Sequence, residues 1–290
     1  MVTAPVIEIR DIEEISELRA VEDLQKEIWG CSDREILPSL TLIPLLEVGG
    51  VLLGAFAGEE LIGFVLGFPG LEDGRPTLHS DMLGVKREYR SHGLGYKLKL
   101  AQRQRALAKG IDRITGTFDP LQSRNAYLNF AKLGVVANRY RKNFYGETSS
   151  FLHTTGTDRL WVTWNLETER VRARLENGPS YQPTEFSDLP RLVRVGEDNA
   201  PVSEEYSGTE GAVIEIPGAI DSLVETTPEL ALRWRASTRA AFVDAINASM
   251  IAEEFFRVER AGRSVGVYLL NKKSRVTETA EFEGSALTLP

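Results

Sequence analysis

A glycine-containing turn, Arg90-Ser91-His92-Gly93-Leu94-Gly95, has the residue types of a phosphate-binding loop. It follows an apolar run that ends at Val85 and precedes a helical pattern that continues to Lys109. Glycines at the mouth of a helix leave backbone N–H groups uncovered, and the helix dipole adds roughly half a positive charge there. The turn therefore predicts a binding site for a phosphate or pyrophosphate group.

Two other phosphate-binding motifs do not fit this turn. A P-loop needs a Gly-Lys-Ser/Thr triplet to reach the phosphates and magnesium, and no such triplet follows. The dinucleotide fingerprint needs a third glycine where Leu98 stands. ATP and nicotinamide nucleotides are therefore not expected as ligands.

The segment from Val85 to Gly95 resembles the acyl-CoA-binding motif of the GCN5-related N-acetyltransferase (GNAT) superfamily. A strand pattern at 111–118 follows, and Ser123 to Val135 is similar to the family's next helix, with its exit at Leu133-Gly134. The resemblance covers roughly residues 1–168. It implies an α/β (α+β) GNAT fold, in which helices flank a mixed, mostly antiparallel sheet.

The resemblance also implies a cofactor and the residues that bind it. The cofactor would be acetyl-CoA or another acyl-CoA such as succinyl-CoA, with its pyrophosphate on the loop amides, and no metal is expected. Backbone groups of the preceding strand would hold the pantetheine and the thioester, with a bulge allowed by Gly84. The residues expected to bind the cofactor are Leu83, Gly84, Val85, Arg90, Ser91, His92, Gly93, Leu94, Gly95, Tyr96, Ser123, Asn125 and Phe130.

One departure from the family concerns the acid that protonates the leaving thiolate. Many members carry a tyrosine where this chain has Phe130, which cannot donate a proton. Tyr145 is the catalytic candidate in its place, and Tyr127 and Tyr140 also lie nearby in the sequence. The alternatives are a thiolate that leaves unassisted by a side chain and a loss of catalysis.

Two side chains are candidates for the general base. His79 and Asp81 alternate with Leu83 and Val85, so we expect all four side chains to point the same way. A carboxylate or imidazole there could accept the proton of an attacking amine, directly or through water. The alternative for Asp81 is a structural hydrogen bond.

A basic and aromatic cluster follows the Leu133-Gly134 exit. Arg139 and Arg141 are interleaved with aromatic residues, and arginine can hold a carboxylate with two hydrogen bonds. We expect them to bind a carboxylate of the acceptor or of a dicarboxylic acyl group, and a solvated loop is the alternative.

Composition excludes several classes of protein. The 290 residues carry a formal net charge of −8 and a pI near 5.2, which argues against nucleic-acid binding. The longest apolar region, 48–68, is interrupted by Gly58-Glu59-Glu60 and predicts a hairpin rather than a membrane span. The single cysteine, Cys31, and the lack of a signal-peptide pattern fit a cytoplasmic protein.

The chain is expected to divide into a GNAT acyl-CoA-binding domain at 1–168 and a smaller α+β extension at 169–290. The extension shows a helical pattern at 229–248 and a hairpin at 255–270, and would cover the site or mediate self-association as a homodimer. The function expected is transfer of an acetyl or succinyl group to a small-molecule amine or amino acid. A non-catalytic acyl-CoA-binding sensor or regulatory module, favoured by Phe130, is the alternative.

Overall fold

The computed structural model describes residues 6–90, 92–150, 153–178 and 188–272. The elements up to residue 165 are β1 (Ile7–Asp11), α1 (Ile15–Trp29), α2 (Ser39–Glu47), β2 (Val51–Ala57), β3 (Glu60–Glu72), β4 (Arg75–Val85), η1 (Arg87–Tyr89), α3 (Leu94–Ala108), β5 (Arg113–Phe118), α4 (Ser123–Ala126), the π-helical η2 (Tyr127–Leu133), β6 (Val136–Arg141) and β7 (Arg159–Asn165). The predicted helix after the glycine turn, the predicted strand at 111–118 and the predicted hairpin at 48–68 are all present.

The C-terminal part adds helices and strands to the same architecture. These elements are α5 (Glu169–Asn177), β8 (Arg191–Val195), β9 (Pro201–Ser203), β10 (Gly211–Pro217), α6 (Ile220–Thr226), α7 (Pro228–Asn247), β11 (Ile251–Arg260) and β12 (Arg263–Asn271). The predicted helix at 229–248 and the predicted hairpin at 255–270 are therefore both present.

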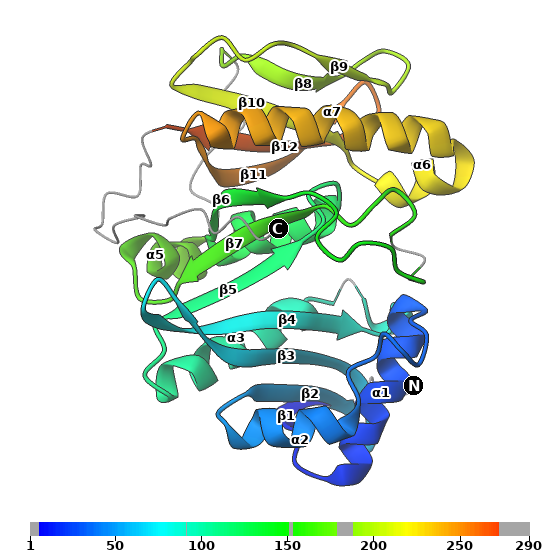
Figure 1. Ribbon diagram of the computed structural model, residues 1–290, viewed down its shortest axis with the longest axis vertical. Coiled ribbons are helices and arrows are strands. Elements are labelled where there is room, and N and C mark those ends of the chain that lie inside the picture. Colours follow the sequence, from blue (N-terminus) through cyan, green and yellow to red (C-terminus); the bar gives the residue numbers. More distant parts are fainter. Residues whose placement is uncertain (1–5, 91, 151–152, 179–187, 273–290) are drawn as a thin grey trace.

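The described strands form one mixed 12-stranded sheet in the order β1-β2-β3-β4-β5-β7-β6-β11-β12-β10-β8-β9 (Figure 1). Two neighbouring pairs are parallel, β4 with β5 and β10 with β8, and the other pairs are antiparallel. The predicted α/β fold class is thus confirmed.

The two faces of the N-terminal half are covered by different helices. Leu18 and Leu24 of α1 are buried in one cluster with Phe64 of β3. In the other cluster, Leu98 of α3 is buried with Leu78 of β4. The apolar stripe of each helix therefore fixes which face of the sheet it covers.

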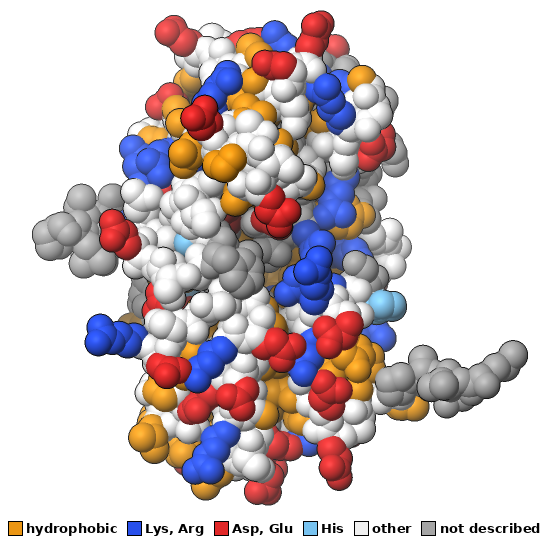
Figure 2. Space-filling model, turned by 90° about the vertical axis from the view of Figure 1, so that its right-hand side faces the viewer, with side chains coloured by type: hydrophobic (Ala, Val, Ile, Leu, Met, Phe, Trp, Pro, Cys, Tyr) orange, Lys and Arg blue, Asp and Glu red, His pale blue; other side chains and the backbone are white. Residues whose placement is uncertain are grey.

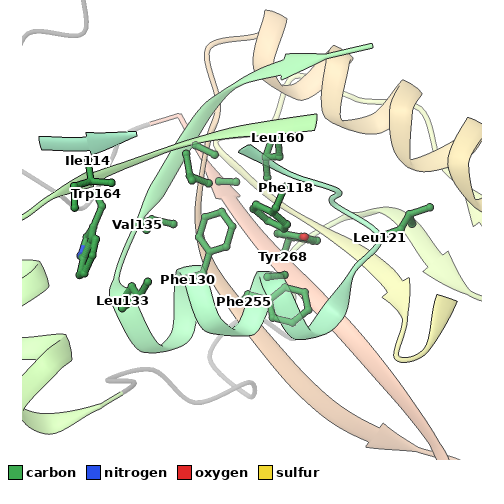
Figure 3. Packing of buried hydrophobic residues seen from close by; sticks show 14 of the residues in the cluster. Ile114, Phe118, Leu121, Phe130, Leu133, Val135, Leu160, Trp164, Phe255 and Tyr268 are labelled. Carbon is green, nitrogen blue, oxygen red and sulfur yellow. The ribbon is translucent and has the colours of Figure 1, made fainter. Parts of the chain in front are cut away.

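The C-terminal part continues both the sheet and the core of the N-terminal half. β11 pairs with β6 at a single position, Ala252 opposite Ala137. Phe130 of η2 is fully buried, with its ring centroid 5.7 Å from that of Tyr268 in β12 and 6.2 Å from that of Phe118 (Figure 3). The division of the chain near residue 168 stays a prediction, because the sheet and this core both run across it.

Buried ion pairs join the same two parts. Asp119, directly after β5, accepts hydrogen bonds of 2.8 and 2.5 Å from the two terminal nitrogens of Arg235 in α7. The side chains of Arg235 and Asp119 are only 3% and 11% exposed. Arg174 of α5 binds Glu254 of β11 at 2.5 Å and also donates to the Phe130 carbonyl at 3.1 Å. These contacts fix η2 and the end of β5 against the C-terminal elements.

A lysine lies in the core between α3 and the sheet. The Nζ atom of Lys99 donates to Ser80 Oγ at 2.9 Å and to Gln102 Oε1 at 2.6 Å, and both acceptors are neutral. Gln102 Nε2 is buried and has no hydrogen-bond partner among the described residues. Burial lowers the pKa of Lys99 to about 7. Lys99 is not among the residues predicted from the sequence, although Lys99 and Gln102 interrupt the buried stripe of α3.

The described residues contain neither a membrane-spanning helix nor a metal-binding cluster of His, Cys, Asp or Glu side chains. None of their helices is both long and apolar enough to cross a membrane. No group of three or more His, Cys, Asp or Glu side chains among them is arranged to hold a metal ion.

The buried pair between Asp119 and Arg235 gives a stability prediction. Asp119→Asn should lower the free energy of unfolding by about 3–5 kcal/mol, because it leaves the Arg235 guanidinium buried without its counter-charge. Asp112→Asn is the matched control, since the ion pair of Asp112 with Arg75 is 49% exposed on both sides and should contribute about 1 kcal/mol or less. Urea unfolding measures both, and equal losses would contradict the assignment.

Lys99 gives a prediction of pH dependence. Between pH 7 and its ordinary pKa of 10.5, Lys99 is protonated in the unfolded chain and neutral in the folded one, so stability rises with pH. Compared with Lys99→Met, the wild type should gain about 1.4 kcal/mol of unfolding free energy per pH unit in this range. Lys97→Met, which changes an exposed lysine of the same helix, should leave the wild-type slope unchanged. Parallel curves for wild type and Lys99→Met would show that Lys99 is not perturbed.

Candidate active site

The sheet opens between its two parallel central strands. β4 and β5 pair only at Leu78 with Ile114, His79 with Thr115 and Ser80 with Gly116. Beyond Ser80, β4 continues to Val85 in pairing with β3 alone, while β5 continues to Phe118 in pairing with β7. We call this gap between residues 81–85 of β4 and residues 117–118 of β5 the strand split.

Backbone groups of β4 point into the strand split. Lys86 N donates to Ile62 O at 2.9 Å, and hydrogen-bonded and non-hydrogen-bonded pairs alternate along antiparallel strands. Met82 and Gly84 therefore bond to β3, whereas Leu83 and Val85 direct their N–H and C=O groups toward the β5 side. The Val85 carbonyl accepts a hydrogen bond of 3.0 Å from Arg90 Nε. The Val85 N–H and both backbone groups of Leu83 face the split.

The bulge in β4 lies at Asp81 rather than at Gly84. Leu66 is opposite Met82 and Gly67 is opposite Ser80, so Asp81 is the extra residue. The expectation that Gly84 allows the bulge is wrong. Gly84 is closely packed instead, because an added Cβ would lie 2.8 Å from Ile28 Cδ1 and that side chain would have to move.

The bulge also changes which side chains share a face. His79 lies opposite Phe68 and on the same face as Met82, which packs with the α1 cluster. Leu83 and Val85 pack with the α3 cluster on the other face. The prediction that His79 points the same way as Leu83 and Val85 is therefore wrong, because one inserted residue shifts the alternation by one position.

Asp81 lies at the apex of the strand split. Its carboxyl group makes no hydrogen bond or ion pair with any other residue that the structure describes, and burial raises its pKa. A carboxylate that is desolvated and has no internal partner is a stronger base than an exposed one. Asp81 thus has the environment of a proton acceptor, and its catalytic role stays a prediction.

His79 is one of a stack of rings beside the apex. Its Nδ1 atom lies 2.9 Å from Thr115 Oγ1, and its ring centroid lies 5.3 Å from that of Phe68 and 4.9 Å from that of Trp161. Burial lowers the pKa of His79 to about 4, so the imidazole is neutral at neutral pH. Its role as a base also stays a prediction.

Tyr145 lies on the β5 side of the strand split. Its hydroxyl is 3.5 Å from Thr117 Oγ1, and Thr117 follows Gly116, the last residue of β5 paired with β4. Asp81 follows Ser80 on the opposite strand, so Asp81 and Thr117, which the Tyr145 hydroxyl approaches, each lie one residue beyond the last strand pair. Phe130, at the family's tyrosine position, is a core residue with no exposed surface.

The predicted phosphate-binding loop lies at the N-terminus of α3, and we call residues 92–96 there the cradle. Gly93 is its N-cap, with φ of 73°, a conformation that L side chains rarely adopt. His92 and Gly93 are exposed, whereas Leu94 is buried, and Ser91 lies outside the described residues. A Cβ added at Gly95 would have Leu83 Cδ2 as its nearest neighbour, at 3.7 Å. The cradle therefore lies beside the strand split, as the acyl-CoA motif predicts.

Other predicted cofactor residues surround the cradle. Tyr96 is half-buried, and Lys132 Nζ lies 5.5 Å from its ring centroid. Ser123 Oγ is buried and has no hydrogen-bond partner among the described residues, so it could bind a ligand. Asn125 is exposed. An unsatisfied hydroxyl and an uncovered cradle are both compatible with coenzyme A.

The predicted carboxylate-binding arginines differ in their surroundings. Arg139 forms an ion pair with Glu72, and its guanidinium carbon lies 4.6 Å from the ring centroid of Trp161. Arg141 is half-buried and has no ion pair with any residue in the described ranges. To bind a substrate carboxylate, Arg139 would therefore have to release Glu72. Arg141 has no such ion pair to break among the described residues.

One family model matches part of the chain. Residues 18–134 match the model of the acetyltransferase (GNAT) family. No curated protein matches the chain.

Solved structures that resemble the chain share little sequence with it. A ribosomal-protein alanine N-acetyltransferase from Escherichia coli is 14% identical, with a TM-score of 0.45, over 56% of this chain and 94% of that one. A GNAT acetyltransferase from Streptococcus pneumoniae is 18% identical, with a TM-score of 0.43, over 55% and 98%. One from Elizabethkingia anophelis with acetyl-CoA bound is 20% identical, with a TM-score of 0.39, over 55% and 98%.

The family match spans the cradle, the strand split and the helical segment up to Gly134. The chain therefore carries an acetyltransferase domain of the GNAT family at residues 18–134, followed by a C-terminal extension.

Proposed function

We propose that this protein transfers an acyl group from acyl-CoA to the amine of a small molecule or amino acid. Membership of the GNAT family supports acyl transfer in general. The observation that carries the proposal is the strand split with the cradle beside it. Backbone groups of Leu83 face the split, and the exposed Gly93 opens the α3 N-terminus next to it.

The chain's own groups are suited to holding the donor. The amides of residues 92–96 would bind the pyrophosphate at the α3 N-terminus. The backbone of Leu83 and the Val85 N–H would bind the pantetheine amides as a neighbouring strand would, and Ser123 Oγ supplies a further free hydroxyl. The donor, when bound, supplies an activated thioester, with acetyl and succinyl as the proposed acyl groups.

Groups on the two sides of the strand split would carry out the two proton transfers, one from the amine and one to the thiolate. The Asp81 carboxylate would accept the proton of the acceptor amine, and its raised pKa makes it better suited to that role. The Tyr145 hydroxyl, beside Thr117, would donate a proton to the leaving thiolate in place of the missing tyrosine at Phe130. His79 is the alternative base.

Fewer observations support the identity of the acceptor, the cellular location and the oligomeric state. Arg139 and Arg141 support an acceptor or acyl group with a carboxylate, with Arg141 as the one without an internal ion pair in the described chain. We place the reaction in the cytoplasm because the sequence has a single cysteine, and we keep the homodimer as a proposal.

The second candidate function is acyl-CoA binding without turnover. Phe130 favours it, because the family's usual acid is replaced by a core side chain. The release of free thiol from acetyl-CoA in the presence of mixed amines and amino acids separates the two functions, since a sensor would bind the donor and release none.

The cradle can be tested by ligand-induced stabilisation. Coenzyme A should raise the melting temperature of the wild type, whereas Gly95→Asp should abolish the shift because it places a carboxylate against the phosphates. Gly95→Ala is the control, since the open space at this position accepts a Cβ without a clash. A shift that persists in a folded Gly95→Asp protein would contradict the cradle.

The base can be tested by turnover and pH. Asp81→Asn should lower turnover by roughly 10²–10⁴-fold while coenzyme A still raises the melting temperature. Wild-type activity should fall as pH decreases through the raised pKa of Asp81, because the protonated carboxyl cannot accept a proton, and this decline should be absent from the residual activity of the variant. Asp73→Asn, in the exposed turn between β3 and β4, should behave as wild type. Near-normal turnover in Asp81→Asn would show that Asp81 is not the general base, and His79 would then be the candidate.

A further inference from the structure

Four arginines lie near the cradle and the start of η2. Arg87 and Arg90 precede the α3 N-terminus, Arg124 is in α4, and Arg257 is in β11 of the C-terminal extension. None of the four forms an ion pair with another described residue. By contrast, six arginines of the C-terminal extension do form ion pairs. Those six are Arg170, Arg174, Arg191, Arg235, Arg239 and Arg260.

Arg90 is close enough to Arg87 and Arg124 for their charges to repel, and so is Arg257 to Arg124. Burial, and then the charges of Arg124 and Arg87, lower the pKa of Arg90, while Asp221 and Glu88 act more weakly in the opposite direction. Burial lowers the pKa of Arg257 as well, and the charge of Arg124 contributes. Cations held together in this way in a chain of net charge −8 form a local site for an anion.

The fold explains how the extension reaches this place. β11 leaves β6 after the single pair at Ala252 and packs along η2. The Arg257 guanidinium carbon lies 4.8 Å from the ring centroid of Tyr127, at the start of η2. Arg124 and Arg257 are both exposed. Lys and Arg side chains gather in the middle of the face of the molecule on which β4 and β5 end (Figure 2).

We propose that Arg257 of the extension, together with Arg124, binds the ribose 3′-phosphate of coenzyme A. This inference rests on the proposed function, in which the cradle amides take the pyrophosphate. Coenzyme A carries a third phosphate beyond that pyrophosphate, and the guanidinium group matches a phosphate with two parallel hydrogen bonds. The extension would then be part of the donor site, contributing a residue outside the segment that matches the family.

The test compares two ligands that differ only in this phosphate. The full-length wild type should bind coenzyme A about tenfold or more tightly than 3′-dephospho-coenzyme A in titration calorimetry, a difference of about 1.4 kcal/mol or more. Arg257→Met should lose about tenfold for coenzyme A and nothing for the dephospho form. Arg257→Lys should retain part of the preference, because it keeps the charge but not the paired hydrogen bonds.

Two controls complete the experiment. Arg233→Met changes an exposed arginine of α7 and should bind both ligands as the wild type does. Circular dichroism and melting temperature of each variant without ligand check that it is folded. Equal binding of both ligands by the wild type, or equal losses for both in Arg257→Met, would overturn the role of Arg257 and leave the cradle standing. Binding of neither ligand by the wild type would overturn the proposed function itself.

Discussion

The parting of β4 from β5 is the constraint on which the candidate site depends. Two parallel strands that stop pairing after three positions leave backbone donors and acceptors of β4 without a strand partner in the middle of a large sheet. Such groups are costly to leave unpaired when they are buried, so the opening favours a ligand that hydrogen-bonds as a strand does. The bulge at Asp81 occurs where pairing stops, and places a carboxyl group at the apex.

The helices on the α3 side and the C-terminal extension support this opening. Leu98 and Leu78 hold α3 against β4, so the cradle at Gly93 lies at the end of the strand split. On the β5 side, the strand runs into Asp119, whose buried pair with Arg235 attaches it to α7. The extension is thus built into the same core as the candidate site.

The site combines groups whose protonation is shifted by burial. The pKa of the Asp81 carboxyl is raised, and that of the His79 imidazole is lowered to about 4. Both shifts favour the neutral form, because burial is the largest cause for each group and outweighs the charge of Glu72 near His79. Lys99, on the other side of β4, is shifted toward its neutral form for the same reason. The centre of the sheet therefore contains ionisable side chains that are more readily neutral than in water.

The sequence by itself indicated the helix after the glycine turn and the strands beside it, because these follow from local periodicity and from the glycines of the turn. The fold class was implied by the resemblance to the GNAT superfamily, and Asp81 was placed on the strand that precedes the turn. Only the tertiary structure decided the face of His79, because an inserted residue in a strand reverses the alternation without changing the pattern of residue types. The pairing of Arg139 with Glu72, the burial of Lys99 and the approach of Arg257 to Arg124 likewise join residues far apart in the chain. No spacing in the sequence encodes such contacts, because they arise when separate elements pack against one another.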